Sequence, residues 1–197
     1  MGAIFQSLGR TIVAGLVILI VILAIAAQMG TPFVNLGAEA WWRLFFRWLH
    51  VLSGVMWIGL LWYFNFVQIP SMPKIPDDQK PAVTKIIAPA VLFWFRWSAL
   101  ATVVTGLILA GMNGYLVAAL TFAGNQTIGV GMWLALIMAF NVWFIIWPNQ
   151  KKALGLVEVS AEEKPKAARI AMLTSRFNTM FSIPMLYCMV AQQNGGL

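Results

Sequence analysis

Charged residues are scarce in this sequence: Asp, Glu, Lys and Arg make up 10% of its 197 residues, whereas 61% are hydrophobic. A soluble domain carries roughly 25% charged residues, so this composition excludes a protein that covers its surface in water. The single cysteine, Cys188, excludes a disulfide within the chain and a cysteine-based zinc site. The single histidine, His50, lies in an apolar stretch without acidic residues, which excludes a catalytic triad. The composition predicts an integral membrane protein.

Long apolar runs are what the sequence does contain. A membrane core ~30 Å thick needs about 20 apolar residues of helix. The first run is longer than the apolar part of a signal peptide, which favours a retained anchor. We therefore predict one all-α membrane domain, 1–197, with five transmembrane helices at about 8–28, 42–66, 86–112, 128–147 and 177–192. The segment 151–175 is expected to be a cytoplasmic loop, either with a short surface helix or as a solvated linker.

Basic residues indicate the orientation of these helices. If the N-terminus is cytoplasmic, the inner side holds ten of the thirteen basic residues. They are Arg10, Lys74, Lys80, Lys85, Lys151, Lys152, Lys164, Lys166, Arg169 and Arg176. Basic residues collect on the cytoplasmic side of membrane proteins, so the pattern predicts an N-terminus inside and a C-terminus outside. It also accounts for the net charge of +7 without a nucleic-acid partner.

His50 is the most informative residue, because an ionisable side chain in a membrane span needs a partner or a function. It lies ~12 Å below the outer boundary of its span, and Arg96 of the next span lies ~15 Å from either face. Gly54 follows His50 by one helical turn and leaves room for a flat ring. This pattern indicates a b-type haem held by His50, with Arg96 or Arg47 binding a propionate.

The same residues also permit simpler roles. His50 could hydrogen-bond a neighbouring helix, since buried polar groups in bundles often only join helices. A haem bound here would need its second axial ligand from a methionine, a lysine, water or another subunit. Polar residues toward the inner side are expected to bond between helices: Asn65, Asn141, Arg176 and Asn178. A transport route through them is a weaker alternative, because the spans contain no acidic residue to relay protons.

Four stretches carry a resemblance to a known family: "RWLHVLSGVMWIGLLWYFNFVQ" from Arg47, "FWFRWSALATVVTG" from Phe93, "NVWFIIWPNQ" from Asn141 and "SRFNTMFSIPMLYCMV" from Ser175. Together they resemble the membrane domain of the urate oxidase–cytochrome c family. More distantly, the first stretch is similar to a span of the membrane protoporphyrinogen oxidases, which implies that His50 is a haem ligand. We expect no cytochrome c domain after the last span, and His50 is the single histidine of the sequence, so we expect the resemblance to extend to a redox-associated bundle rather than to urate oxidation.

These observations predict an accessory subunit of a larger redox or energy-converting complex of a bacterial inner membrane, respiratory, photosynthetic or monooxygenase in type. The alternative is a b-type haem protein that transfers electrons itself, and a small transporter is a third. Expected partners are other membrane subunits, lipids, and haem or pigments. No catalytic residue stands out, so we do not expect this chain to catalyse a reaction alone.

Overall fold

The computed structural model describes residues 2–29 and 35–194, and all regular structure within these stretches is helical. The chain divides into two compact units, Met1–Phe45 and Phe46–Leu197. The first unit contains α1 (Gly2–Phe5), α2 (Leu8–Gln28) and the start of α3 (Glu39–Trp62). Within this unit none of the 21 residues of α2 is buried.

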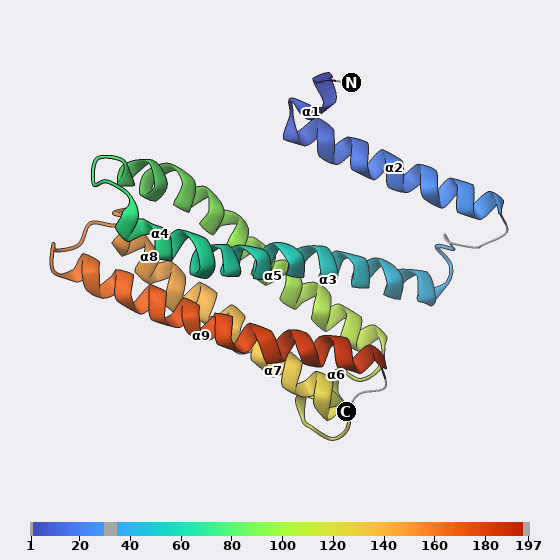
Figure 1. Cartoon of the computed structure of the whole chain (residues 1–197). Helices are drawn as coiled ribbons and strands as arrows, with labels where there is room; N and C mark the ends of the chain where they lie inside the picture. Colours follow the sequence, from blue (N-terminus) through green and yellow to red (C-terminus); the bar gives the residue numbers. More distant parts are fainter. Residues whose placement is uncertain (1, 30–34, 195–197) are drawn as a thin grey trace. The chain divides into compact units, whose positions relative to one another are not determined.

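The second unit is a bundle in which three long helices follow the rest of α3 (Figure 1). The α-helices are α4 (Ile69–Ser71), α5 (Ala88–Met112), α6 (Leu116–Leu120), α7 (Gln126–Phe140), α8 (Trp147–Ala153) and α9 (Glu163–Ala191). The π-helical segments are η1 (Tyr63–Gln68), η3 (Ala82–Ile87) and η4 (Asn141–Ile146), and the 3₁₀ segments are η2 (Met72–Lys74) and η5 (Gln192–Asn194). The continuous rod formed by α7, η4 and α8 packs along α9.

Each π-helical segment ends two residues before a proline: Pro70, Pro89 and Pro148. A proline inside a helix lacks an N–H group, and its ring collides with the carbonyl group four residues earlier. That carbonyl group lies within the π-helical segment in all three cases, where the wider turn moves it aside. The wider turns thus explain how the three helices continue past their prolines without a break.

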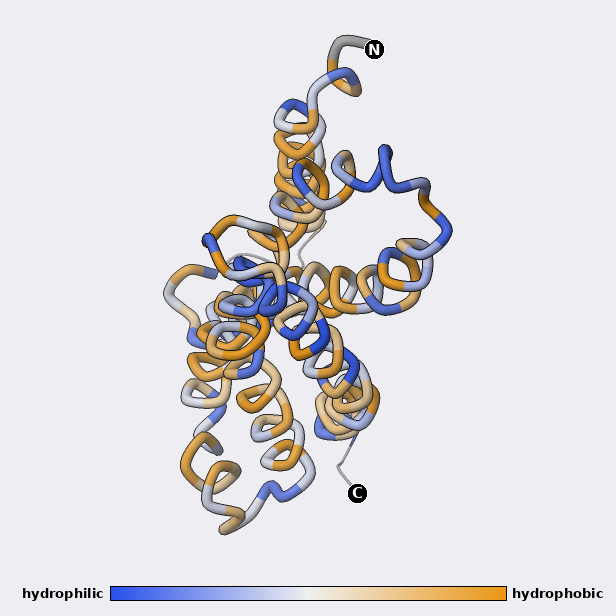
Figure 2. The backbone as a smooth tube through the Cα atoms, turned by 90° about the vertical axis from the view of Figure 1, so that its left-hand side faces the viewer, coloured by the Kyte–Doolittle hydropathy of each residue, from blue (hydrophilic) through white to orange (hydrophobic). Residues whose placement is uncertain are grey.

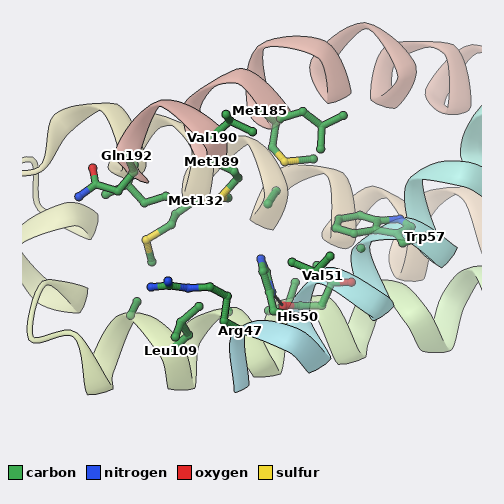
Figure 3. Close-up of a pocket in the computed structure, with 18 of the residues that line it drawn as sticks. Arg47, His50, Val51, Trp57, Leu109, Met132, Met185, Met189, Val190 and Gln192 are labelled. Carbon is green, nitrogen blue, oxygen red and sulfur yellow. Dashed lines mark hydrogen bonds between the residues drawn. The ribbon is translucent and has the colours of Figure 1, made fainter. Parts of the chain in front are cut away.

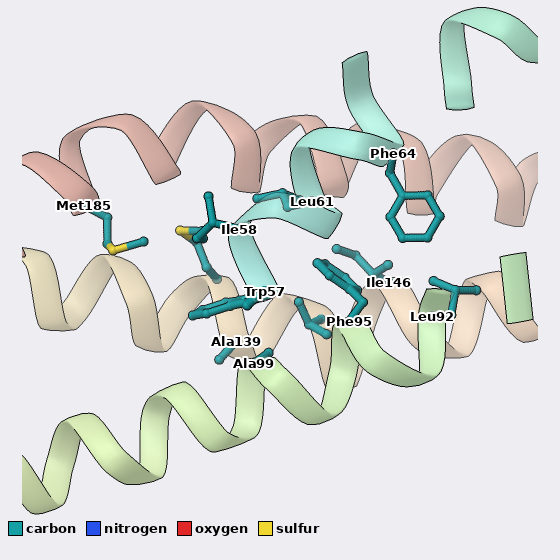
Figure 4. Close-up of a cluster of buried hydrophobic side chains, with 12 residues drawn as sticks. Trp57, Ile58, Leu61, Phe64, Leu92, Phe95, Ala99, Ala139, Ile146 and Met185 are labelled. Carbon is teal, nitrogen blue, oxygen red and sulfur yellow. The ribbon is translucent and has the colours of Figure 1, made fainter. Parts of the chain in front are cut away.

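The main hydrophobic core lies where α3 and η1 meet α5, α7 and η4. Trp57, Leu61 and Phe95 are fully or almost fully buried there, and the ring of Phe64 packs edge-on against Phe95 at 5.8 Å (Figure 4). We call this group the inner cluster; its buried members are Trp57, Ile58, Leu61, Phe64, Leu92, Phe95, Ala99, Met138, Ala139, Val142, Ile146 and Met185. A smaller outer cluster contains Ala110, Ala119, Ile128 and Met132.

Four helices among the described residues are long and apolar enough to cross a membrane: Leu8–Gln28, Glu39–Lys74, Ala82–Met112 and Gln126–Ala153. They contain the first four predicted spans, and the apolar colour dominates the long helical stretches in Figure 2. These helices are those of a multi-pass membrane protein. The fifth predicted span, 177–192, lies in α9 except for Gln192, which begins η5. Helix α9 is not one of the four, because polar residues such as Arg176 and Asn178 interrupt its apolar sequence.

The predicted cytoplasmic segment 151–175 contains the end of α8, a connection over 154–162 and the first part of α9. An ion pair of 2.6 Å between Lys152 and Glu163 joins α8 to the first turn of α9. The α-helix then continues through Pro184 to Ala191. The expected surface helix and the expected fifth span are therefore parts of one helix of 29 residues.

Candidate functional site

A cavity of about 850 Å³ lies between α3, α5, α7 and α9 of the second unit. Its walls are mostly aliphatic, aromatic and methionine side chains, with a few polar groups. Ligand sites in proteins are commonly apolar cavities of roughly 300–1,000 Å³ with a small number of placed polar groups. This cavity is therefore the candidate functional site of the described part of the chain.

His50 lies on α3, and its ring extends from this helix into the cavity (Figure 3). The Nδ1 atom lies 2.9 Å from the backbone carbonyl oxygen of Thr102 on α5. A carbonyl oxygen can only accept, so Nδ1 carries the hydrogen and donates it. In the neutral ring Nε2 then keeps its lone pair, which can bind a metal or accept a hydrogen bond.

Gly106 provides the space for this ring. A Cβ atom at position 106 would lie 2.8 Å from Cε1 and 3.1 Å from Nδ1 of His50, closer than ordinary contacts allow. The neighbouring hydroxyl of Thr105 lies 3.4 Å from Nδ1 but donates to the carbonyl oxygen of Ala101 at 2.6 Å. The backbone of α5 therefore fixes both the position and the tautomer of His50.

Polar residues gather at one end of the cavity: Arg47, Asn113, Tyr115, Gln192 and Gln193. The buried Nε atom of Arg47 has no hydrogen-bond partner among the described residues. Burial raises the pKa of the Tyr115 phenol, and the positive charge of Arg47 offsets part of that rise. An unpaired guanidinium nitrogen beside a neutral phenol can receive an anionic group such as a carboxylate.

The rest of the cavity is apolar and rich in methionine. Met132 of α7 and Met185 of α9 are buried, and Met189 of α9 is half-buried. The fully buried Trp57 also lines the cavity, and its Nε1 has no hydrogen-bond partner among the described residues. Within those residues no group of three His, Cys, Asp or Glu side chains could hold a bare metal ion.

The residues predicted for the haem site separate into two groups. His50, Arg47 and Gly54 all line the cavity. Arg96 does not line it: its guanidinium carbon lies 3.3 Å from the ring centroid of Trp147 in a cation–π contact. His50 meets α5 at Thr102, six residues beyond Arg96 and so ~9 Å along the helix. The structure therefore places Arg47, and not Arg96, beside the histidine.

Most of the predicted interhelical polar residues join helices. Asn65 donates to Ser175 of α9 at 2.8 Å, and Asn141 donates to the Oδ1 atom of Asn178 at 2.8 Å. The fully buried Asn178 donates in turn to the carbonyl oxygen of Met138 at 2.9 Å. Arg176 differs, because it is exposed on α9.

Sequence reasoning did not identify Thr102, Gly106 or Tyr115 as parts of the site. Thr102 acts through its backbone carbonyl group, which every residue has, so its side chain gave no signal. Gly106 could have been suspected, since a glycine in an apolar helix leaves space for a close neighbour. Trp62 and Ser182, whose side chains bond at 3.0 Å between α3 and α9, were also missed.

Comparison with known proteins finds one similarity, which lies in the C-terminal part of the bundle. No curated protein and no solved structure matches the chain. Residues 115–195, which include α7, α9 and their share of the cavity wall, match the family model described as "Urate oxidase N-terminal". Two of the four motifs quoted above, those that begin at Asn141 and Ser175, lie inside the matched range. The match confirms for this segment the resemblance seen in the sequence: residues 115–195 are similar to the urate oxidase N-terminal family.

Proposed function

We propose that this chain is an integral membrane subunit of a redox complex and that it binds one haem b through His50. The observation that carries the proposal is the 2.9 Å contact between Nδ1 of His50 and the Thr102 carbonyl oxygen, which requires Nδ1 to carry the hydrogen. Metal-binding histidines almost always donate their other ring nitrogen to a carbonyl or carboxylate oxygen. Here that condition is met beside a cavity of about 850 Å³.

The residues present fit a haem in three further respects. The imidazole is packed so closely against Gly106 that a methyl group there would displace it. The unpaired Nε of Arg47 offers a partner for a carboxylate at the polar end of the cavity. The remaining wall is apolar, which excludes water from an iron site and adjusts its reduction potential.

When bound, a haem would supply one-electron transfer, and the chain's own residues would hold and orient it. His50 would bind the iron through Nε2, with its ring orientation set by Thr102. Arg47 would hold a carboxylate toward the Tyr115 end of the cavity. Gly54, which lines the cavity one turn after His50, leaves the α3 backbone accessible to a flat ring.

We further propose five membrane spans in the bacterial inner membrane, with the N-terminus in the cytoplasm. Two observations support the fifth span: α9 packs along α7, η4 and α8, and its polar residues Asn178 and Ser182 bond inward to neighbouring helices. A helix that packs along a spanning helix and satisfies its polar groups internally can share its depth. The ten basic residues of the predicted inner side support the orientation.

Exposed aromatic side chains on the second unit support the proposal that this chain is a subunit of a complex. Trp94, Trp97 and Phe144 expose 56%, 48% and 68% of their surface. Together with the many exposed aliphatic side chains, these rings offer contacts to lipids and to neighbouring membrane subunits. The proposal assigns electron transfer, and no chemistry on a substrate, to this chain.

The test is the haem content of the full chain, produced in a haem-synthesising host and purified in mild detergent. We expect stoichiometric haem b by pyridine haemochrome in the wild type and its loss in His50→Ala. Gly59→Ala is the control, because it lines the same cavity and its new methyl group would meet nothing within 4 Å. Equal haem in His50→Ala and wild type, or none in either, would refute the haem proposal. Recovery of the tagged chain alone from its native membrane, after mild crosslinking, would refute the subunit role.

A further inference from the structure

This inference rests on the proposed haem and concerns the side of the ring opposite His50. Among the described residues that line the cavity, four besides His50 belong to the residue types that serve as haem ligands: Tyr115, Met132, Met185 and Met189. The phenol of Tyr115 is protonated at neutral pH, since its ordinary pKa is near 10 and burial raises it further, and a protonated phenol is a poor ligand. The choice is therefore among three methionines.

The level of His50 along the bundle narrows this choice. On α5 the histidine meets Thr102 and Gly106. These residues lie between Ala99, which belongs to the inner cluster, and Ala110, which belongs to the outer cluster. His50 thus points into the gap between the two clusters.

The three methionines lie at different levels. Met185 is a buried member of the inner cluster, and Met132 is a buried member of the outer cluster. Met189 alone of the three packs against both clusters, so it lies at the level of the gap. It is also less buried than the other two, so it can move with less loss of packing.

Close packing of α9 against α7 brings the Met189 side chain inward. A Cβ atom at Gly131 of α7 would lie 2.9 Å from the Cβ of Cys188 and 3.4 Å from the Cε of Met189. Only a glycine at position 131 allows this approach without displacement of α9. Figure 3 shows Met189 between Met185 and Met132, across the cavity from the His50 ring.

We infer that the thioether sulfur of Met189 is the second axial ligand, which gives a histidine–methionine site within a single chain. This arrangement removes the need for a second histidine from another subunit. A thioether ligand favours ferrous iron and raises the reduction potential relative to paired histidines. The flexible methionine side chain can adjust its position when the ring enters the cavity.

The experiment compares Met189→Leu with the matched variants Met132→Leu and Met185→Leu, each as the purified full-length protein with haem. The first readout is the weak far-red absorption band that a methionine sulfur gives to ferric haem, and the second is the midpoint potential. We expect Met189→Leu to retain haem through His50, to lose the band and to shift to lower potential. The two control variants should keep the band.

X-ray absorption at the iron edge of the wild type provides a readout that needs no variant. In protein labelled with selenomethionine we expect a selenium neighbour of the iron, and in Met189→Leu none. A wild type that binds haem but shows neither the band nor selenium would overturn this inference and leave the proposed function standing. Loss of the band in Met132→Leu or Met185→Leu, with Met189→Leu unchanged, would also overturn it. A wild type without haem would overturn both.

Discussion

Replacement of Gly106 by alanine tests the contact that fixes His50. The new Cβ would lie 2.8 Å from Cε1 of the imidazole, so the ring must move away from the Thr102 carbonyl oxygen. Overpacking of this kind costs about 1–3 kcal/mol, and the hydrogen bond at risk contributes about 1 kcal/mol. Because haem binding must return the ring to its ligating position, we expect a loss of about 2 kcal/mol in haem affinity, which is on the order of 30-fold.

Gly59→Ala is the control that measures the general effect of replacing a helical glycine by alanine. Both changes replace a helical glycine by alanine and gain up to about 1 kcal/mol of helix propensity. At Gly59 the added methyl group meets nothing within 4 Å, so its haem affinity should match that of the wild type. The assay is haem titration of the two variants in detergent, followed by absorption. Affinities of Gly106→Ala and Gly59→Ala that agree within threefold would refute the assigned role of the α5 backbone.

Three further changes probe the surroundings of the site. Arg96→Gln should lower the thermal unfolding midpoint, because it removes a cation–π contact of about 1 kcal/mol. It should leave haem content unchanged, and a loss of haem would contradict the position of Arg96 outside the cavity. Asn178→Ala should destabilise the protein by about 1–2 kcal/mol, because Asn178 donates a hydrogen bond to a neighbouring helix. Asn149→Ala should cost less, because Asn149 donates to the carbonyl oxygen of Ile145 in its own helical rod. Equal thermal unfolding midpoints for the two variants would contradict this. Since burial raises the pKa of Tyr115, the folded state loses stability as pH rises from the phenol's ordinary pKa, near 10, toward its raised pKa in the folded state. Tyr115→Phe should remove this loss, and parallel alkaline stability curves would contradict it.

Sequence reasoning selected His50 because membrane burial makes a histidine costly. A single ionisable group within a membrane span needs a function or a partner, and in the structure His50 lines the cavity described above. The residues around His50 were harder to predict from the sequence, because they come from distant parts of the chain. The Thr102 carbonyl group is 52 residues away and belongs to the backbone, so no residue type marks it.

The position of Arg96 shows a different limit. Depth arithmetic allowed His50 and Arg96 to lie at similar levels, with helix ends uncertain by a few residues and with regular helices between those ends. The π-helical segments near Pro70 and Pro89 change the rise and rotation between the two spans. A helix that begins a few residues earlier than expected shifts its level by ~5 Å. The guanidinium consequently reaches Trp147 and not the cavity.

The polar residues of α9 explain why its role as a span could not be read from hydropathy alone. Asn178 and Ser182 are fully buried within the second unit, and their hydrogen bonds reach Met138 and Trp62. Hydropathy counts such residues as unfavourable in a membrane, although their partners on neighbouring helices satisfy them. Only the packing of the helices reveals those partners.

Chemical rescue of His50→Gly would test the central claim most directly. The variant leaves a space where the imidazole stood, next to the Thr102 carbonyl oxygen and Gly106. Our account predicts that purified His50→Gly lacks haem, and that added imidazole restores stoichiometric haem with a wild-type spectrum, measured by pyridine haemochrome and reduced-minus-oxidised absorption. Stoichiometric haem in His50→Gly without imidazole would contradict the account.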